Sequence, residues 1–154
     1  MSVEGCLGCD LSAGRQSLPG GVIHDAGTWL VEHCIGPLGV GTLIVKPRRH
    51  VTRVADLTED EAGALGPLLL RATQIVTELT EPEQTYVTLW SHSGGVPVHI
   101  HFVVQPITSE LRDAHGGLYG LTLQLAMFEA GELPPVPEVE AFADRARELF
   151  AKRS

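Results

Sequence analysis

The segment 98–104 constrains the fold of this chain more than any other part of the sequence, because its side chains alternate in character. Successive side chains of a β-strand point to opposite faces, so a strand here places His99, His101 and Val103 on one face. The other face then carries only apolar side chains (Val98, Ile100, Phe102 and Val104). The pattern predicts a strand that packs one face on a core and presents two imidazoles on the other.

Four more strands are expected. Runs of β-branched and aromatic residues favour strands at 22–24, 28–34, 42–45 and 85–90. The first two runs are separated by an Asp-Ala-Gly sequence at 25–27, which is typical of a hairpin turn. These two strands are therefore expected to pair as an antiparallel hairpin.

Helical patterns add two or three helices. Thr58 and Glu61 form a capping-box signature, and apolar residues then recur at helical spacing as far as about Leu79. The glycine–proline pair at 66–67 is expected to kink or restart this long helix. A second amphipathic helix is expected from Pro137 to the end of the chain. Together the elements predict an α+β fold with an antiparallel sheet.

Length and composition fit one domain covering residues 1–154. The 154 residues are 44% hydrophobic, enough for a single core. Eleven Lys and Arg against 19 Asp and Glu give a formal charge of −8, which argues against binding to duplex nucleic acid. The sequence has neither the apolar run of a membrane span nor the pattern of a signal peptide, so no membrane contact and a cytoplasmic location are expected.

The cysteines allow several interpretations. Cys6 and Cys9 form a Cys-x-x-Cys pair and Cys34 stands alone. The pair is compatible with a redox couple, with half of a metal site or with two incidental thiols. Residues 10–21 after it have the composition of a loop, which argues against a redox couple at a strand-to-helix turn. Cys34 is expected to be a buried apolar residue.

These pieces, in this order, give the sequence a resemblance to the histidine triad (HIT) superfamily. The matching segments are Cys6–Cys9, Gly41–Val51, the capped helix after 56–59, and Gly94–Pro106. The resemblance covers about residues 5–107, and 108–154 form a C-terminal extension. It implies a HIT-like fold with about five antiparallel strands, one long helix and a C-terminal helix. It also implies a homodimer and a small nucleotide or nucleotide conjugate as the ligand.

The family motif has three alternating histidines, and this chain has two. If His99 and His101 are the first and second, Val103 replaces the third; if they are the second and third, Pro97 replaces the first. The first register is preferred, because it places Gly94 and Pro106 as the family has them and leaves His99 free for a metal.

The resemblance also implies a metal site. In zinc-containing members, a Cys-x-x-Cys pair, a histidine after the Pro-Arg-Arg sequence and the first triad histidine bind one Zn²⁺. The corresponding residues here are Cys6, Cys9, His50 and His99. Four nitrogen and sulfur ligands with no open position are typical of a structural zinc site.

The chemistry implied for His101 is attack on the α-phosphorus of a nucleotide, with formation of a nucleotidyl-histidine. Backbone N–H groups of Ser93, Gly94 and Gly95, in an expected loop at 91–95, are candidates for binding phosphate oxygens. The enzyme would be a hydrolase or a nucleotidyl transferase, depending on the acceptor that resolves the intermediate.

Basic and aromatic residues near these motifs have two interpretations each. Lys46, with Arg48 and Arg49, would either steer a polyphosphate to the site or form a solvated surface loop. Trp29 and Trp90 would either stack on a base or, as tryptophans in strands usually do, belong to the core.

Two departures from the family pattern affect the chemistry. Val103 and Val96 stand where the family has a histidine and a serine or threonine, and neither side chain donates a hydrogen bond. Gln105, on the same strand face as His101, is the first candidate for the missing donor, with His92 and Ser93 as others. The alternative is a nucleotide-binding or interaction protein without activity.

Overall fold

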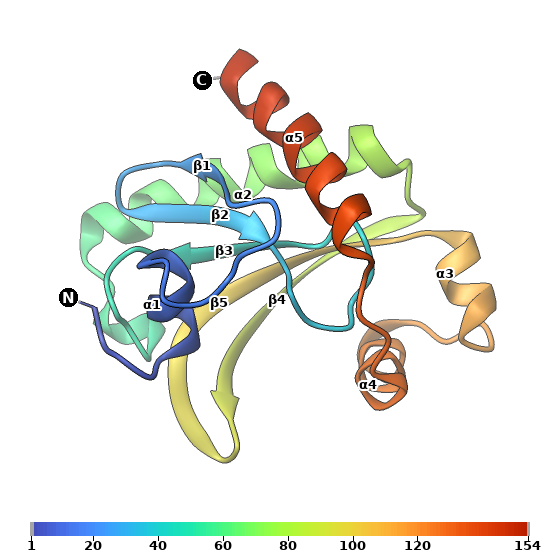
Figure 1. Ribbon diagram of the computed structural model, residues 1–154, viewed down its shortest axis with the longest axis horizontal. Coiled ribbons are helices and arrows are strands. Elements are labelled where there is room, and N and C mark those ends of the chain that lie inside the picture. Colours follow the sequence, from blue (N-terminus) through green and yellow to red (C-terminus); the bar gives the residue numbers. More distant parts are fainter. Residues whose placement is uncertain (1, 154) are drawn as a thin grey trace.

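A five-stranded antiparallel sheet forms the centre of the computed structural model, which describes residues 2–153 (Figure 1). Its strands follow the order β1-β2-β3-β5-β4, so β5 lies between β3 and the edge strand β4. The bounds are Val22–Asp25 (β1), Trp29–His33 (β2), Leu43–Pro47 (β3), Gln84–Ser93 (β4) and Val96–Ile107 (β5). The predicted α+β class and antiparallel sheet are confirmed.

The hairpin of β4 and β5 is longer than expected. The loop predicted at 91–95 is wrong, because β4 continues to Ser93, which pairs with Val96. Only Gly94 and Gly95 form the turn, with φ angles of 58° and 80°. Two consecutive residues with positive φ make the tight turn that matches the twist of paired strands, and glycine adopts it without strain.

Two long helices cover one face of the sheet. Helix α2 (Glu59–Thr80) begins with the predicted capping box, in which Thr58 Oγ1 accepts from the Glu61 N–H and Glu61 accepts from the Thr58 N–H. The helix runs through Pro67 without the predicted restart. Helix α5 (Val136–Lys152) is the predicted C-terminal helix and packs on β1 and α2.

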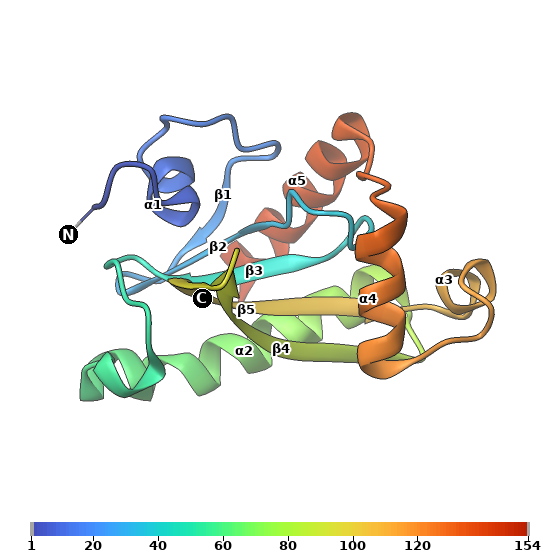
Figure 2. The same ribbon diagram turned by 90° about the horizontal axis from the view of Figure 1, so that it is seen from below.

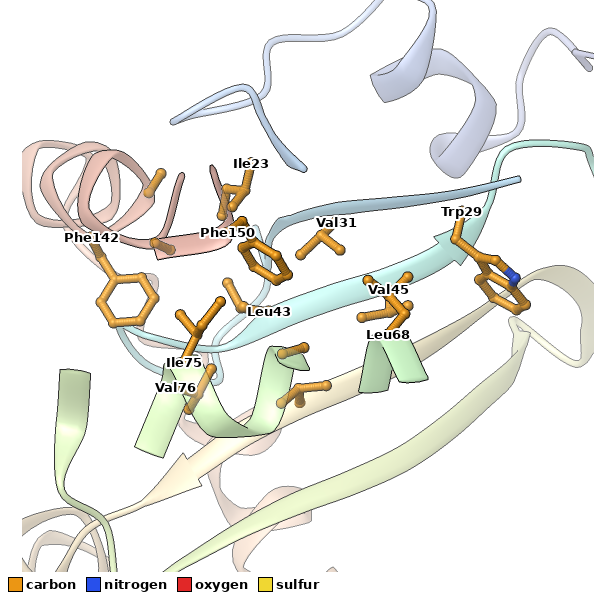
Figure 3. Close-up of a cluster of buried hydrophobic side chains, with 14 residues drawn as sticks. Ile23, Trp29, Val31, Leu43, Val45, Leu68, Ile75, Val76, Phe142 and Phe150 are labelled. Atoms are coloured by element: carbon orange, nitrogen blue, oxygen red, sulfur yellow. The ribbon is translucent and has the colours of Figure 1, made fainter. Parts of the chain in front are cut away.

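The main core lies between these helices and the sheet (Figure 3). Strand residues of one parity, such as Val31, Val45 and Val104, contact Ile75 of α2 and Phe142 of α5 within one cluster of buried apolar side chains. Trp29 also belongs to this cluster and is fully buried, so its predicted place in the core is confirmed.

The other face of the sheet is covered by shorter elements. Helix α1 (Leu7–Ser12) lies on the side of the sheet opposite α2 (Figure 2). The remaining helices are α3 (Ser109–Ala114), α4 (Gly120–Ala130) and a 3₁₀ turn at Val54–Asp56. The described chain thus has five α-helices, more than the two or three expected.

The expected loop at 10–21 is wrong at its start, because residues 10–12 are helical. Asp10 explains this locally: its side chain accepts from the Gly5 N–H at 3.2 Å and from Arg15 Nε at 2.6 Å. Cys9, Asp10 and Leu11 are buried against the sheet. Packing therefore stabilises a helix that is too short to be stable alone. Among the described residues, no helix combines the length and the hydropathy of a membrane span.

Candidate functional site

A cleft of about 730 Å³ opens on the sheet face that α2 and α5 leave uncovered. The N-terminal segment, the ends of β2 and β3, the β4–β5 hairpin and α4 surround it. Its lining includes both histidines of the alternating strand, His99 and His101. The predicted alternation is confirmed over 99–104, since Phe102 and Val104 face the main core while the two imidazoles face the cleft, but Val98 also lines the cleft.

Four predicted ligands converge beside this cleft. The side-chain ligand atoms of Cys6, Cys9, His50 and His99 all lie within 4.8 Å of one another. Cys9 Sγ is 3.4 Å from His50 Nδ1 and 3.5 Å from His99 Nδ1, and Cys6 Sγ is 3.8 Å from His99 Nδ1. Residues from α1, the segment after β3, and β5 thus meet at one point.

This geometry fits a tetrahedral zinc site. Zinc bonds of about 2.3 Å to sulfur and about 2.0–2.1 Å to nitrogen place tetrahedral S and N ligands about 3.6 Å apart. The three S–N distances, 3.4, 3.5 and 3.8 Å, bracket that value. The two cysteines are free thiols. The donor set and its spacing can therefore hold Zn²⁺.

Neighbouring groups set the orientation and protonation state of the predicted metal ligands. His99 Nε2–H donates to the Pro47 carbonyl at 2.7 Å, which leaves Nδ1 unprotonated and directed at the cysteines. Burial lowers the pKa of His99 to about 4, so the ring is neutral at pH 7. Burial also raises the pKa of the Cys9 thiol, so its thiolate needs a nearby cation.

His101 is arranged differently from His99. Its Nδ1–H donates to the His99 carbonyl at 3.0 Å, which leaves Nε2 as the basic nitrogen. Burial lowers the pKa of His101, so this imidazole is also neutral at pH 7. Trp90 pairs with His101 across the β4–β5 ladder, and its ring lies 4.7 Å from the Phe128 ring of α4. Both aromatic residues line the cleft, so they form a wall next to His101.

Gln105 does not reach the cleft. It is fully buried, and its amide nitrogen donates to the Leu38 carbonyl at 3.1 Å and lies 3.3 Å from the sulfur of Met127. Its amide oxygen accepts from Gln124 Nε2 at 3.0 Å. These contacts argue against the predicted role of Gln105 as a hydrogen-bond donor to the ligand. The covering helix α4, which the sequence analysis did not identify, is the physical reason.

Of the other residues at the positions discussed for the missing hydrogen-bond donor, two carry polar side chains into the cleft and two are valines. Val103 is buried in an apolar cluster with α4, and Val96 is 58% exposed at the hairpin tip. His92 and Ser93 both line the cleft. Gly94 and Gly95 form the exposed turn beyond them and are absent from the lining, so the structure brings only Ser93 of the three predicted phosphate-binding residues to the cleft.

The side chains of the basic cluster, Lys46, Arg48 and Arg49, all form ion pairs. Arg48 pairs with Asp25 and Arg49 with Glu61. Lys46 lines the cleft but is 1% exposed, and its Nζ donates to Glu32 Oε1 and to the Gly8 carbonyl, both at 2.8 Å. The predicted steering of a polyphosphate by free cations therefore has no support here.

Sequence reasoning missed two residues of this site. Glu32 was included in the strand 28–34 only as a strand residue, although a carboxylate in an otherwise apolar strand is a signal for a buried partner. Phe128 falls in a region whose structure was not predicted. Trp90, which had two interpretations, packs against the second apolar cluster and also lines the cleft.

Comparisons with known proteins identify the fold. The sequence matches no protein-family model and no curated protein. Solved structures do match. A HIT-like protein involved in cell-cycle regulation from Bartonella henselae has a TM-score of 0.70 at 12% identity, covering 97% of this chain and 99% of that one.

Two other structures are similar over most of their length. A Zn-bound histidine triad family protein from Mycobacterium smegmatis has a TM-score of 0.67 at 17% identity, with 97% and 95% of the two chains covered. A hypothetical histidine triad nucleotide-binding protein from Sulfolobus tokodaii strain 7 has a TM-score of 0.70 at 14% identity, with 96% and 93% covered. The resemblance inferred from the sequence is confirmed for the fold, and it extends through the segment 108–154.

Proposed function

We propose that this chain, which has the fold of the histidine triad proteins, binds a nucleotide or nucleotide conjugate in the cleft and transfers its nucleotidyl group to His101. One observation carries the proposal. Nδ1–H of His101 is held by the His99 carbonyl at 3.0 Å, and the ring lines the cleft, so the lone pair of Nε2 is available to a ligand. Burial lowers the pKa of His101, which keeps this nitrogen unprotonated near pH 7.

The reaction proceeds in two displacements at the α-phosphorus. Nε2 of His101 forms a bond to phosphorus while the bond to the leaving group breaks, and the leaving group departs with the bonding electron pair. Water or another acceptor then attacks the same phosphorus, loses a proton and releases His101. Because Val103 and Gln105 offer no donor in the cleft, a leaving group that departs as a stable anion, such as a second phosphate chain, suits this site best.

Zinc would have a structural role. The resident metal would supply charge compensation for the two thiolates and join the N-terminal segment to β5 through Cys6, Cys9, His50 and His99. With four protein ligands the site has no position for a substrate. Zinc thiolates need reduced cysteines, and this requirement fits the proposed cytoplasmic location.

A homodimer is also proposed, through the edge strand β4. This strand has ten residues and pairs only with β5 in the sheet, and Val87 and Leu89 on it are each 42% exposed. A long edge strand with exposed apolar side chains is a surface that proteins usually cover. Sedimentation of the wild type and of Leu89→Lys tests this, since the proposal expects a dimer and a monomer respectively.

A second function is favoured by one observation. Val103 stands in the third position of the motif and is buried among apolar side chains, so a ligand can be bound without protonation of its leaving group. The protein would then be a nucleotide-binding protein that turns over slowly or not at all. Binding without turnover is the outcome that identifies it.

The experiment that separates the two functions uses an adenosine phosphoramidate and a dinucleoside polyphosphate, with wild type and His101→Ala. We expect the wild type to release nucleoside monophosphate from the polyphosphate more readily than from the phosphoramidate. The variant should bind both and release nothing. Binding by both proteins with no release by either would establish the second function, and the absence of binding would contradict both.

A further inference from the structure

The strongest unexplained feature of the cleft is a buried ion pair beside the cysteine segment, Cys6–Cys9, which is the N-cap and first turn of α1. Lys46 and Glu32 are 1% and 2% exposed. They project from neighbouring strands on the same face of the sheet, and Nζ lies 2.8 Å from Oε1. Burial raises the pKa of the Glu32 carboxyl, and the nearby Lys46 ammonium opposes that shift. Neither the nucleophile nor the metal ligands include this pair.

Burial of this ion pair costs free energy. Taking two charges out of water costs free energy that their attraction recovers only when every polar atom is satisfied. Here Glu32 Oε2 has no hydrogen-bond partner among the described residues. A pair of apolar residues of similar size would stabilise this position equally well or better. The unpartnered oxygen directs attention to the other contact that Lys46 makes.

The second contact of Lys46 is with the cysteine segment. Its Nζ donates to the carbonyl of Gly8 at 2.8 Å, and Gly8 lies between the two cysteines. Gly8 also packs on His99, because a Cβ added to it would lie 3.0 Å from Nδ1 and 3.1 Å from Cγ of that ring. The ammonium, together with Ser12 Oγ, which donates to the same carbonyl at 2.9 Å, therefore holds the backbone of the cysteine segment against the histidine of the proposed metal site.

The adjacent residue holds the other side of the same site. The Pro47 carbonyl accepts from His99 Nε2 at 2.7 Å and so fixes which nitrogen of His99 faces the cysteines. Two consecutive residues at the end of β3 thus orient ligands from two distant parts of the chain. Pro47 does this through its backbone, which any residue could supply, whereas the contact to Gly8 needs a long side chain with a donor at its tip.

The structure assigns Lys46 a role as a positioning residue: its buried ammonium, neutralised by Glu32, fixes the cysteine segment in the geometry that binds zinc. This inference rests on the proposed zinc site and goes beyond it. Outer groups that orient metal ligands typically affect metal affinity ten- to a hundredfold. The expected cost of losing Lys46 is of that size.

The test measures zinc affinity by competition with a chromophoric chelator, for wild type and for Glu32→Leu/Lys46→Met. The double variant removes both charges, so neither is left buried alone. We expect its zinc affinity to fall by about ten- to a hundredfold. Unfolding of its metal-free form should need as much denaturant as the wild type, or more. With cobalt(II) in place of zinc, the d–d absorption bands should shift, which a purely structural role would not cause.

Arg48→Met is the matched control, because Arg48 is a nearby basic residue that pairs with Asp25 and touches no ligand. It should leave the zinc affinity and the cobalt spectrum unchanged. If the metal-free double variant does not fold, Glu32→Gln/Lys46→Met, which also leaves no buried charge and removes the donor to Gly8, decides in the same assay by the same criterion. A zinc affinity within twofold of the wild type would overturn the inference while leaving the zinc site intact. Failure of the wild type to bind zinc would overturn the zinc site itself.

Discussion

The two faces of the sheet differ in what their buried side chains do. Beneath α2 and α5, a cluster of buried apolar side chains that includes Val31, Ile75 and Phe142 forms the main core, and the imidazole of His33 packs edge-on against Phe142. On the other face, Glu32, Lys46, His99 and Gln105 are all at most 3% exposed, and each is polar. Both faces bury apolar side chains, because Cys34, Ile44, Val103 and Met127 belong to a second buried cluster on the cleft side, but only the cleft side adds this set of buried polar groups, at a cost in stability.

The two faces of the sheet should respond differently to substitution, one in stability and the other in binding. Substitutions on the helix-covered face should change the free energy of unfolding and leave ligand and metal binding intact. Substitutions of residues that line the cleft should change ligand or metal binding and have smaller or even favourable effects on stability. The following predictions test this division, from the largest expected effect to the smallest.

Phe142→Ala tests the helix-covered face. Phe142 is 2% exposed in the main core, so its truncation leaves a cavity and should lower the free energy of unfolding by about 3–5 kcal/mol. Denaturant titration measures this, and zinc affinity of the folded variant should stay within twofold of the wild type. A large loss of zinc affinity would mean that the two faces are coupled.

Gln105→Leu tests a polar residue that the sequence assigned to catalysis. The substitution removes one of the two donors to the Leu38 carbonyl and leaves Gln124 Nε2 with only a 3.5 Å contact to Thr88 Oγ1, which should lower the free energy of unfolding by about 1–3 kcal/mol. Because Gln105 does not line the cleft, nucleotide release should proceed at the wild-type rate. A rate that falls tenfold while binding is unchanged would restore its catalytic role.

His33 sharpens the comparison, because it is a polar residue packed edge-on against Phe142 of the main core. Burial lowers the pKa of His33 below that of the unfolded chain. The unfolded state therefore binds the proton first as the pH falls, and stability is complete above about pH 6.5 and declines below it. His33→Phe should be less stable at pH 8, because Gly41 N–H loses its acceptor, and its stability should decline less steeply between pH 6.5 and 5. Equal slopes for both proteins would contradict this assignment.

The elements predicted correctly from the sequence are those that depend on local patterns of residues. The alternation at 98–104 and the capping box at Thr58 and Glu61 depend on neighbours in the chain, and both are confirmed. The resemblance brought together four ligands that the structure also brings together. Their spacing along the chain alone would not have done so.

The parts that were missed depend on distant contacts. Helix α1 is too short to form without its packing on the sheet. The burial of Gln105 depends on α4, whose sequence shows little amphipathic pattern because Leu121 and Leu125 are exposed on it. The pairing of Glu32 with Lys46 depends on the register of β2 and β3, which no local pattern reports.

The central claim is that Nε2 of His101 is the nucleophile, and the direct measurement is the mass of the protein during reaction. Wild type and His101→Ala are mixed with a dinucleoside polyphosphate and quenched in alkali, because the phosphorus–nitrogen bond of the intermediate is labile in acid. The account predicts that the wild type gains the mass of one nucleotidyl group on the peptide that contains His101, and that the variant gains none. Turnover by the wild type with no such adduct, or turnover that survives in His101→Ala, would contradict it.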